Sequence, residues 1–179
     1  MPDSCSSPLG AATQRKVLSG HHYNALDIQI PQMKFAWFLP RLFVPAILIN
    51  YVWEVVQAPL YVGMENFNLV WWHCGLAALG DGLLVLLIYA VGWAVLRSRD
   101  WFVHPGAIGY AVMLFAGLVI SVGVEWLAVF ITNRWAYTAR MPLVPLLNVG
   151  LAPVAQMLVL PPLIFRIVAA GRNHASAAK

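Results

Sequence analysis

Four long apolar stretches constrain this chain more than any other feature of its sequence. They cover about 41–62, 73–96, 106–131 and 143–168, and each exceeds the roughly 20 residues that a helix needs to cross about 30 Å of hydrocarbon. Backbone polar groups in lipid must be satisfied within the segment itself, so each stretch should be helical. The sequence therefore predicts an all-α integral membrane protein, a bundle of four transmembrane helices joined by short loops.

Composition supports this class and leaves no room for a separate soluble domain. The chain is 61% hydrophobic and 10% charged, whereas soluble domains carry about 25% charged residues. No polar segment approaches the roughly 50 residues of an independent domain. We expect a polar arm over 1–34, one transmembrane domain over 35–168 and a tail over 169–179. Alternating residues in 28–38 favour either a short interfacial helix or a partly ordered tail.

The positions of Lys and Arg predict the orientation. If the amino terminus is inside, only Arg134 and Arg140 of the 11 basic residues face outward, as the positive-inside rule requires. Both termini should then be cytoplasmic, and a short chain without a cleavable signal indicates a bacterial inner membrane. The same rule accounts for the net charge of +4, so membrane lipids are the expected partners and nucleic acid is not.

One polar stripe marks the outer half of the first predicted helix. At about 100° per residue, Asn50, Glu54, Gln57 and Tyr61 fall within roughly 60° of one another. The other three stretches also carry polar residues in their outer halves, namely His73, Asp81, Ser121, Glu125 and Asn148. Ionisable groups at membrane depth are costly and usually turned inward, which indicates a shared functional site.

Four residues are candidates for proton transfer. Glu54, Asp81 and Glu125 have no Lys or Arg beside them in their own helices, so mutual repulsion and burial would keep at least one protonated and able to donate. His73 at the outer mouth could relay a proton from solvent. The alternatives are structural: each acid could be hydrogen-bonded across the bundle, and His73 could be merely solvated.

A second set of residues should shape the pocket or hold a substrate. Its members offer amides, aromatic rings or one positive charge, and they are Asn50, Gln57, Tyr61, Trp53, Trp126, Arg134, Trp135, Tyr137, Asn148 and Gln156. The alternative for the tryptophans is an aromatic belt at the membrane surface. Arg134 could instead pair with the acids, hold an anionic headgroup or stay solvated.

Motifs for common cofactors and metals do not occur in the sequence. There is no P-loop, Gly-x-Gly-x-x-Gly, Gly-x-Ser-x-Gly or His-Glu-x-x-His motif. Neither Cys-x-x-Cys nor His-x-x-x-His is present. Cys5 and Cys74 fall on opposite sides of the predicted membrane and should not pair. We expect neither a cofactor nor a metal.

The pair Trp53-Glu54 is similar to a pair that integral-membrane terpene cyclases place in an early span. In those enzymes a carboxylic acid starts cyclisation by protonation, so the resemblance implies such a role for Glu54. Lycopene-cyclase and sterol-isomerase membrane families also use intramembrane acids and aromatic residues, but their longer motifs do not occur here. The resemblance covers two residues and assigns no family.

Three functions fit these residues. The favoured hypothesis is an acid–base enzyme that acts on a lipophilic substrate, an isoprenoid or a lipid. The second is a proton- or cation-coupled small transporter, which would need polar residues that continue toward the inner face. The third is a non-catalytic membrane subunit or assembly factor, whose polar groups would contact partner membrane subunits or a second copy of the chain.

Overall fold

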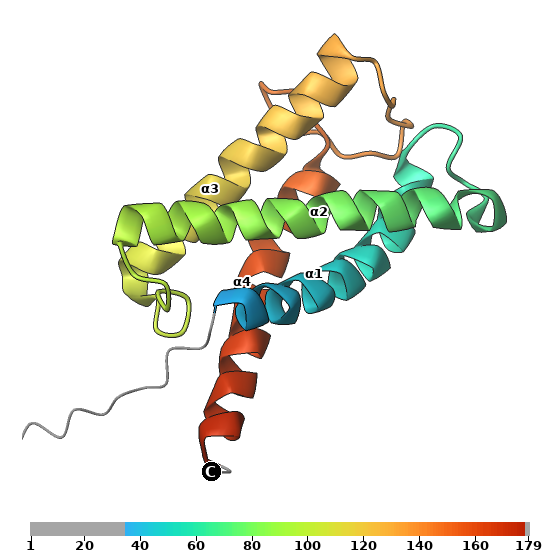
Figure 1. Ribbon diagram of the computed structural model, residues 1–179. Helices are drawn as coiled ribbons and strands as arrows, with labels where there is room; N and C mark the ends of the chain where they lie inside the picture. The colour runs from blue at the N-terminus through green and yellow to red at the C-terminus, as the bar shows by residue number, and fades with distance from the viewer. Residues whose placement is uncertain (1–34, 178–179) are drawn as a thin grey trace, which may run out of the picture. The chain divides into compact units, whose positions relative to one another are not determined.

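The computed structural model describes residues 35–177, and four helices account for most of this region (Figure 1). They are α1 (Phe35–Gln57), α2 (Phe67–Leu96), α3 (Gly106–Trp126) and α4 (Leu151–Ala177). A 3₁₀ turn, Ala58–Leu60, extends α1, and a π-helical turn, Leu127–Ile131, extends α3. Apart from two isolated bridges, residues 35–177 contain no β-structure. The predicted all-α class is confirmed.

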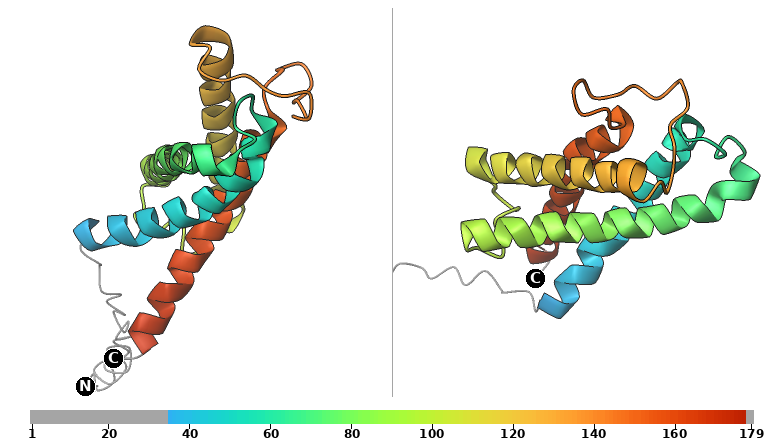
Figure 2. Two further views of the ribbon diagram at one scale, coloured as in Figure 1. Left: turned by 90° about the vertical axis from the view of Figure 1, so that its right-hand side faces the viewer. Right: turned by 90° about the horizontal axis from the view of Figure 1, so that it is seen from above.

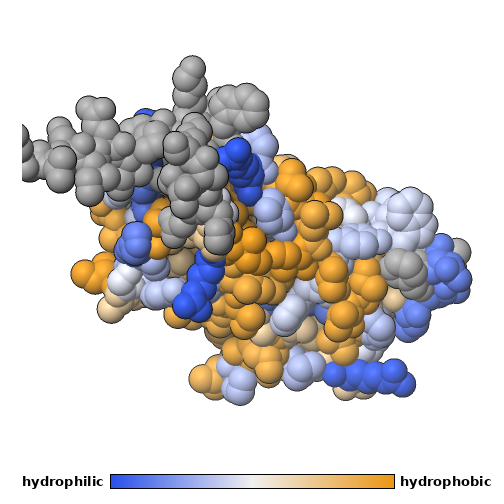
Figure 3. All heavy atoms as spheres, turned by 90° about the horizontal axis from the view of Figure 1, so that it is seen from below, coloured by the Kyte–Doolittle hydropathy of each residue, from blue (hydrophilic) through white to orange (hydrophobic). Residues whose placement is uncertain are grey.

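Each helix is long and apolar enough to cross a membrane. The four candidate spans are Phe38–Leu60, Val70–Leu96, Gly106–Ile131 and Leu151–Gly171. Their outward faces carry large apolar side chains, such as Val44, Leu48, Val52 and Val56 along α1. Figure 3 shows a broad hydrophobic surface across one face of the molecule. Apolar surface of this extent is unusual for a protein in water, and it is consistent with an integral membrane protein.

The helices pack in the cyclic order α1, α2, α3, α4. Both α2 and α4 pack against α1 and α3, while α2 and α4 touch each other only slightly. In Figures 1 and 2, α4 crosses α2 at a steep angle instead of running alongside it. The close approach of α3 and α4 depends on Gly117, because an added Cβ would lie 2.3 Å from the Met157 carbonyl oxygen.

Aromatic side chains fill the end of the unit where α2 finishes and α3 begins. Phe102, in the loop between these helices, packs against Phe38, Tyr89 and Phe165 with ring centroids 5.2, 5.9 and 5.7 Å away. The neighbouring Trp101 donates its indole N–H to the Tyr89 carbonyl over 3.2 Å. Both loop residues are buried. The α2–α3 loop thus forms part of the core, and this end of the unit is closed.

The fourth helix differs from its predicted bounds. It begins at Leu151, not 143, and continues to Ala177. Residues 142–150 form a tight turn, in which Leu146 and Asn148 adopt left-handed φ values of 69° and 54°. The turn is closed by a 2.7 Å bond from the Leu151 N–H to the Pro142 carbonyl. Hydropathy alone included this apolar turn in the span, although prolines at 142 and 145 favour its non-helical backbone.

Three further predicted segments differ from the structure or lie beyond it. Helix α1 begins at Phe35, six residues before the predicted span. The predicted tail over 169–179 is helical as far as Ala177. The polar arm over 1–34, including most of the suggested interfacial helix, lies outside the described residues.

Replacement of Gly117 by alanine should separate α3 from α4. The added methyl group meets backbone, which cannot rotate away, and overpacking of this kind costs about 1–3 kcal/mol. We expect a lower unfolding midpoint in detergent micelles, measured by circular dichroism during heating. Gly123→Ala is the matched control, because its Cβ meets nothing within 4 Å. Equal midpoints for the two variants would contradict the close approach at Gly117.

Candidate functional site

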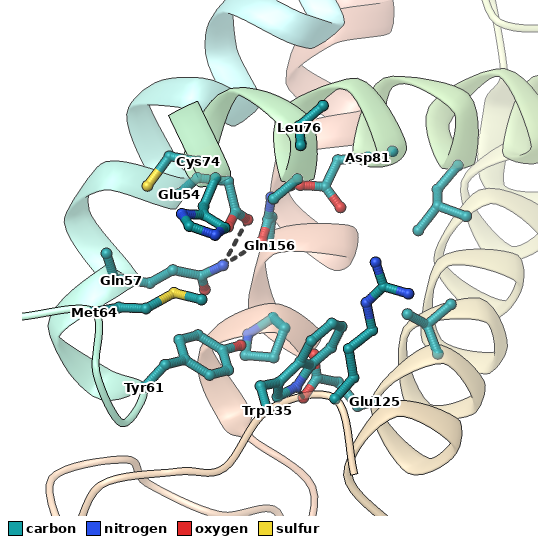
Figure 4. A pocket seen from close by; sticks show the side chains of 18 residues that line it. Glu54, Gln57, Tyr61, Met64, Cys74, Leu76, Asp81, Glu125, Trp135 and Gln156 are labelled. Atoms are coloured by element: carbon teal, nitrogen blue, oxygen red, sulfur yellow. Dashed lines mark hydrogen bonds between the residues drawn. The ribbon is translucent and has the colours of Figure 1, made fainter. Parts of the chain in front are cut away.

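One cavity of about 630 Å³ receives side chains from all four helices. It lies where α1 and α3 finish and α2 and α4 begin (Figure 4), and its volume is typical of small-molecule sites. Its polar and aromatic lining comprises Glu54, Gln57, Tyr61, His73, Asp81, Glu125, Arg134, Trp135 and Gln156. The apolar lining includes Ala58, Met64, Leu76, Ala77, Leu84, Val124 and Pro153.

Two glutamines in the cavity wall connect α1 to α4. The Gln57 amide nitrogen donates to Glu54 Oε1 over 2.6 Å and to Gln156 Oε1 over 3.2 Å, the two dashed contacts of Figure 4. The Gln57 oxygen accepts the indole N–H of Trp53 over 3.1 Å. Both glutamines are at least 95% buried. All the hydrogen-bonding atoms of the Gln57 amide are therefore used within the protein, and its orientation is determined.

Gln156 extends this network to α2. Its amide nitrogen donates to Asp81 Oδ2 over 2.8 Å and to Asn50 Oδ1 over 2.9 Å. The Asn50 amide in turn donates to the Ala46 carbonyl over 2.8 Å. Glu54 and Asp81 are thereby linked through the two glutamines, because Gln57 donates to Glu54 and to Gln156, and Gln156 donates to Asp81. The carboxyl groups of Glu54 on α1 and Asp81 on α2 therefore lie on the same wall of the cavity as the Gln156 amide of α4.

Glu125 forms the opposite wall of the cavity and has its own partners. Its Oε2 accepts the phenolic O–H of Tyr137 and the indole N–H of Trp135, the latter over 3.4 Å. Tyr137 also accepts the Gly150 N–H over 2.9 Å. Burial and the hydrogen bond to Glu125 raise the pKa of Tyr137 above its ordinary value. The phenol therefore stays protonated at neutral pH and donates to the carboxylate.

The segments after α1 and α3 pair with each other and hold this wall in place. The Val62 N–H donates to the Ala136 carbonyl and the Thr138 N–H to the Leu60 carbonyl, both over 2.9 Å. Tyr61 is consequently in extended conformation, with φ −109° and ψ 142°, and not on the helix as predicted. Its ring meets Trp135 edge to face, with centroids 6.2 Å apart. Backbone pairing keeps Tyr61 in the cavity even though the helix has ended.

The structure brings most of the predicted site residues together. All four proton-transfer candidates, Glu54, Asp81, Glu125 and His73, line the cavity, as do five of the predicted binding residues: Gln57, Tyr61, Arg134, Trp135 and Gln156. Three further predicted binding residues lie behind the wall, each hydrogen-bonded to a lining residue: Asn50, Trp53 and Tyr137. The predicted proximity of the three acids is thus observed, while their roles stay predictions.

Two predicted binding residues do not reach the cavity. Asn148 is exposed in the 142–150 turn, because α4 starts later than predicted. Trp126 is 52% exposed and directed away, since it follows Glu125 directly on the helix. Ser121 is buried on the same face of α3 as Glu125, but it does not line the cavity, and its hydroxyl donates to the Leu118 carbonyl within its own helix over 3.1 Å.

One face of α2 lines the cavity without having been predicted to do so. Cys74, Ala77 and Leu84 of α2 line the cavity with Asp81, and their spacing of three, four and three residues is that of one helix face. Residues three or four positions before and after Asp81 share its helix face, so the helical period marks these positions in the sequence. His73, one position earlier, is exposed and stacks on Trp72 with ring centroids 3.5 Å apart.

Comparisons with known protein families, with curated proteins and with solved structures give no significant match to this chain. Its function must therefore be argued from the site itself. Within residues 35–177, no group of three or more His, Cys, Asp and Glu side chains is arranged to hold a metal ion. What the cavity offers is three carboxyl groups, held by amide, phenol and indole donors, in a largely apolar enclosure.

Replacement of Gln156 by leucine should destabilise the helical unit. It would leave acceptors on Asp81 and Asn50 and a donor on Gln57 without their partner, and each unsatisfied buried group costs about 1–3 kcal/mol. We expect a clearly lower unfolding midpoint in micelles by heating. Ser121→Ala is the control, because that hydroxyl bonds only within its own helix. A change no larger than the control's would show that the network is not required.

Proposed function

We propose that this protein is an integral-membrane acid–base enzyme that acts on a lipophilic substrate of the isoprenoid or lipid class. One observation carries the proposal: carboxyl groups from three helices line a single cavity whose remaining walls are mostly apolar and aromatic. Acid–base chemistry needs a proton donor and an acceptor at the same substrate, and apolar walls suit a hydrophobic reactant.

The two walls suggest a division of roles. Glu54 and Asp81 line the same wall and are linked through Gln57 and Gln156, and one of them in its protonated form would serve as the general acid. Glu125 accepts hydrogen bonds from Trp135 and Tyr137, which orient its carboxyl group for a role as base or as stabiliser of a positive charge. His73, exposed and at the edge of the cavity, would exchange protons with solvent.

The proposed orientation places the cavity in the outer half of the membrane. Arg134 and Arg140 follow α3 at the cavity end. Arg97 and Arg99 lie in the α2–α3 loop at the opposite end, and Arg166 lies in the second half of α4. The positive-inside rule then puts both termini in the cytoplasm. A bacterial inner membrane is the proposed location, and the substrate would enter from the outer leaflet.

The closed aromatic end supports an enzyme over a carrier. A carrier must expose its site to both sides in turn. Beyond Gln156, however, the buried core toward the far end is apolar and aromatic, with Met157, Leu160, Ile164 and Phe165 along α4. Among the described residues, polar side chains therefore do not continue along this buried part of α4.

Removal of each cavity acid should abolish function. We expect Glu54→Gln, Asp81→Asn and Glu125→Gln to lower activity by about 10²–10⁴, the usual contribution of a general acid or base. The measurement is rescue of a deletion strain together with its lipid-extract profile, in which a hydrophobic precursor should accumulate. Glu65→Gln is the matched control, since Glu65 is exposed and outside the cavity.

The other hypotheses predict different outcomes in the same experiment. If all three variants remain folded and rescue fully, the enzyme and the coupled carrier both fail, and a non-catalytic subunit is left. If the variants fail to rescue while the lipid profile of the deletion strain is unchanged, the carrier is favoured over the enzyme.

A further inference from the structure

The cavity holds more negative than positive groups. Glu54, Asp81 and Glu125 line it, and the basic side chains of the lining are Arg134 and His73, both of which are exposed. The polar partners that the structure gives these carboxyls are neutral: amide, indole and phenol donors. Charges held this way in an apolar enclosure are costly. Protonation would relieve that cost, and a positively charged ligand would relieve it as well.

The geometry argues against an inorganic ion as that ligand. Within residues 35–177, no set of three or more acidic, His or Cys side chains converges on a metal-sized point. Glu54 and Asp81 stand on one wall, and Glu125 stands across the cavity beside Trp135 (Figure 4). A space of about 630 Å³ between them suits an organic molecule. Its positive charge would have to be spread over a large hydrophobic body.

Aromatic rings and a thioether in the cavity lining could contact such a cation. Tyr61 and Trp135 meet edge to face at the cavity, and both belong to the lining together with the thioether of Met64. Ring faces attract organic cations, and the attraction grows when water is excluded. The same walls present apolar surface from Leu84 and Val124.

We propose that this cavity binds a hydrophobic organic cation in exchange for a proton. The inference rests on the proposed function, since it describes the substrate site of the same enzyme: the substrate is either a lipophilic amine or a molecule that becomes cationic during the reaction. In either case, a stable hydrophobic cation should occupy the cavity and compete with protons for its carboxyl groups.

The test compares two ions of the same shape and opposite charge. Tetraphenylphosphonium and tetraphenylborate are titrated into the full-length protein in neutral detergent micelles by calorimetry, with empty micelles subtracted. We expect the cation to bind at least about tenfold more tightly than the anion, which corresponds to about 1.4 kcal/mol. Its binding should release protons into weakly buffered solution. Its affinity should rise with pH, because fewer protons then compete. Equal affinities for the two ions would overturn the inference.

Variants locate the binding at the cavity. Glu54→Gln and Asp81→Asn should each weaken binding of tetraphenylphosphonium by about tenfold, and the matched Glu65→Gln should leave it unchanged. If an acid variant fails to fold, Arg134→Gln still tests the inference. Removal of this exposed positive charge should tighten binding of tetraphenylphosphonium about two- to fivefold. Unchanged affinity in all three cavity variants would also overturn the inference.

Failure of this inference is distinguishable from failure of the proposed function. If the acid variants lose rescue but the wild-type protein binds neither ion, the enzyme stands and its substrate is not cationic. If the cation binds and is lost in the acid variants, yet these variants rescue fully, the binding site stands and the catalytic proposal fails.

Discussion

The arrangement of the cavity end depends on the hydrogen bonds of one buried residue, Gln156. Helices α2 and α4 touch only slightly, yet the Gln156 amide binds Asp81 of α2 and Asn50 of α1, and it accepts from Gln57. Polar groups buried in an apolar environment are stable only when they are paired. Because these partners are on α1 and α2 while Gln156 is on α4, satisfying them also determines where the three helices meet. The site and the local fold are therefore held by the same bonds.

The two ends of the helical unit are stabilised by different kinds of interaction. At the closed end, Trp101 and Phe102 fold back from a loop into the core, and dispersion and apolar burial hold them there. At the cavity end, directional hydrogen bonds hold separate walls around an open volume. Between them, α3 and α4 approach closely at Gly117, where an added Cβ would lie against the Met157 carbonyl oxygen.

Non-helical backbone supplies one wall of the site. A π-helical turn follows α3 directly after Trp126, and such turns are common near functional sites. The chain then pairs with the end of α1, which brings Trp135 and Tyr137 to Glu125. Irregular backbone in an apolar environment is tolerated where it lines a cavity and its polar groups are satisfied. Glu125 thus owes its partners to the connection and not to a neighbouring helix.

The sequence by itself determined the helical class, the number of long apolar helices and most of the polar residues that line the cavity. It could do so because hydropathy and the helical period are local properties, which need no knowledge of neighbouring helices. Only the tertiary structure decided the order of the helices and the pairing of Gln156 with Asp81. It also decided the late start of α4, which removed Asn148 from the site, and the backbone pairing that kept Tyr61 in it. These features depend on contacts between residues far apart in the chain, and no local pattern records which distant group satisfies a buried donor.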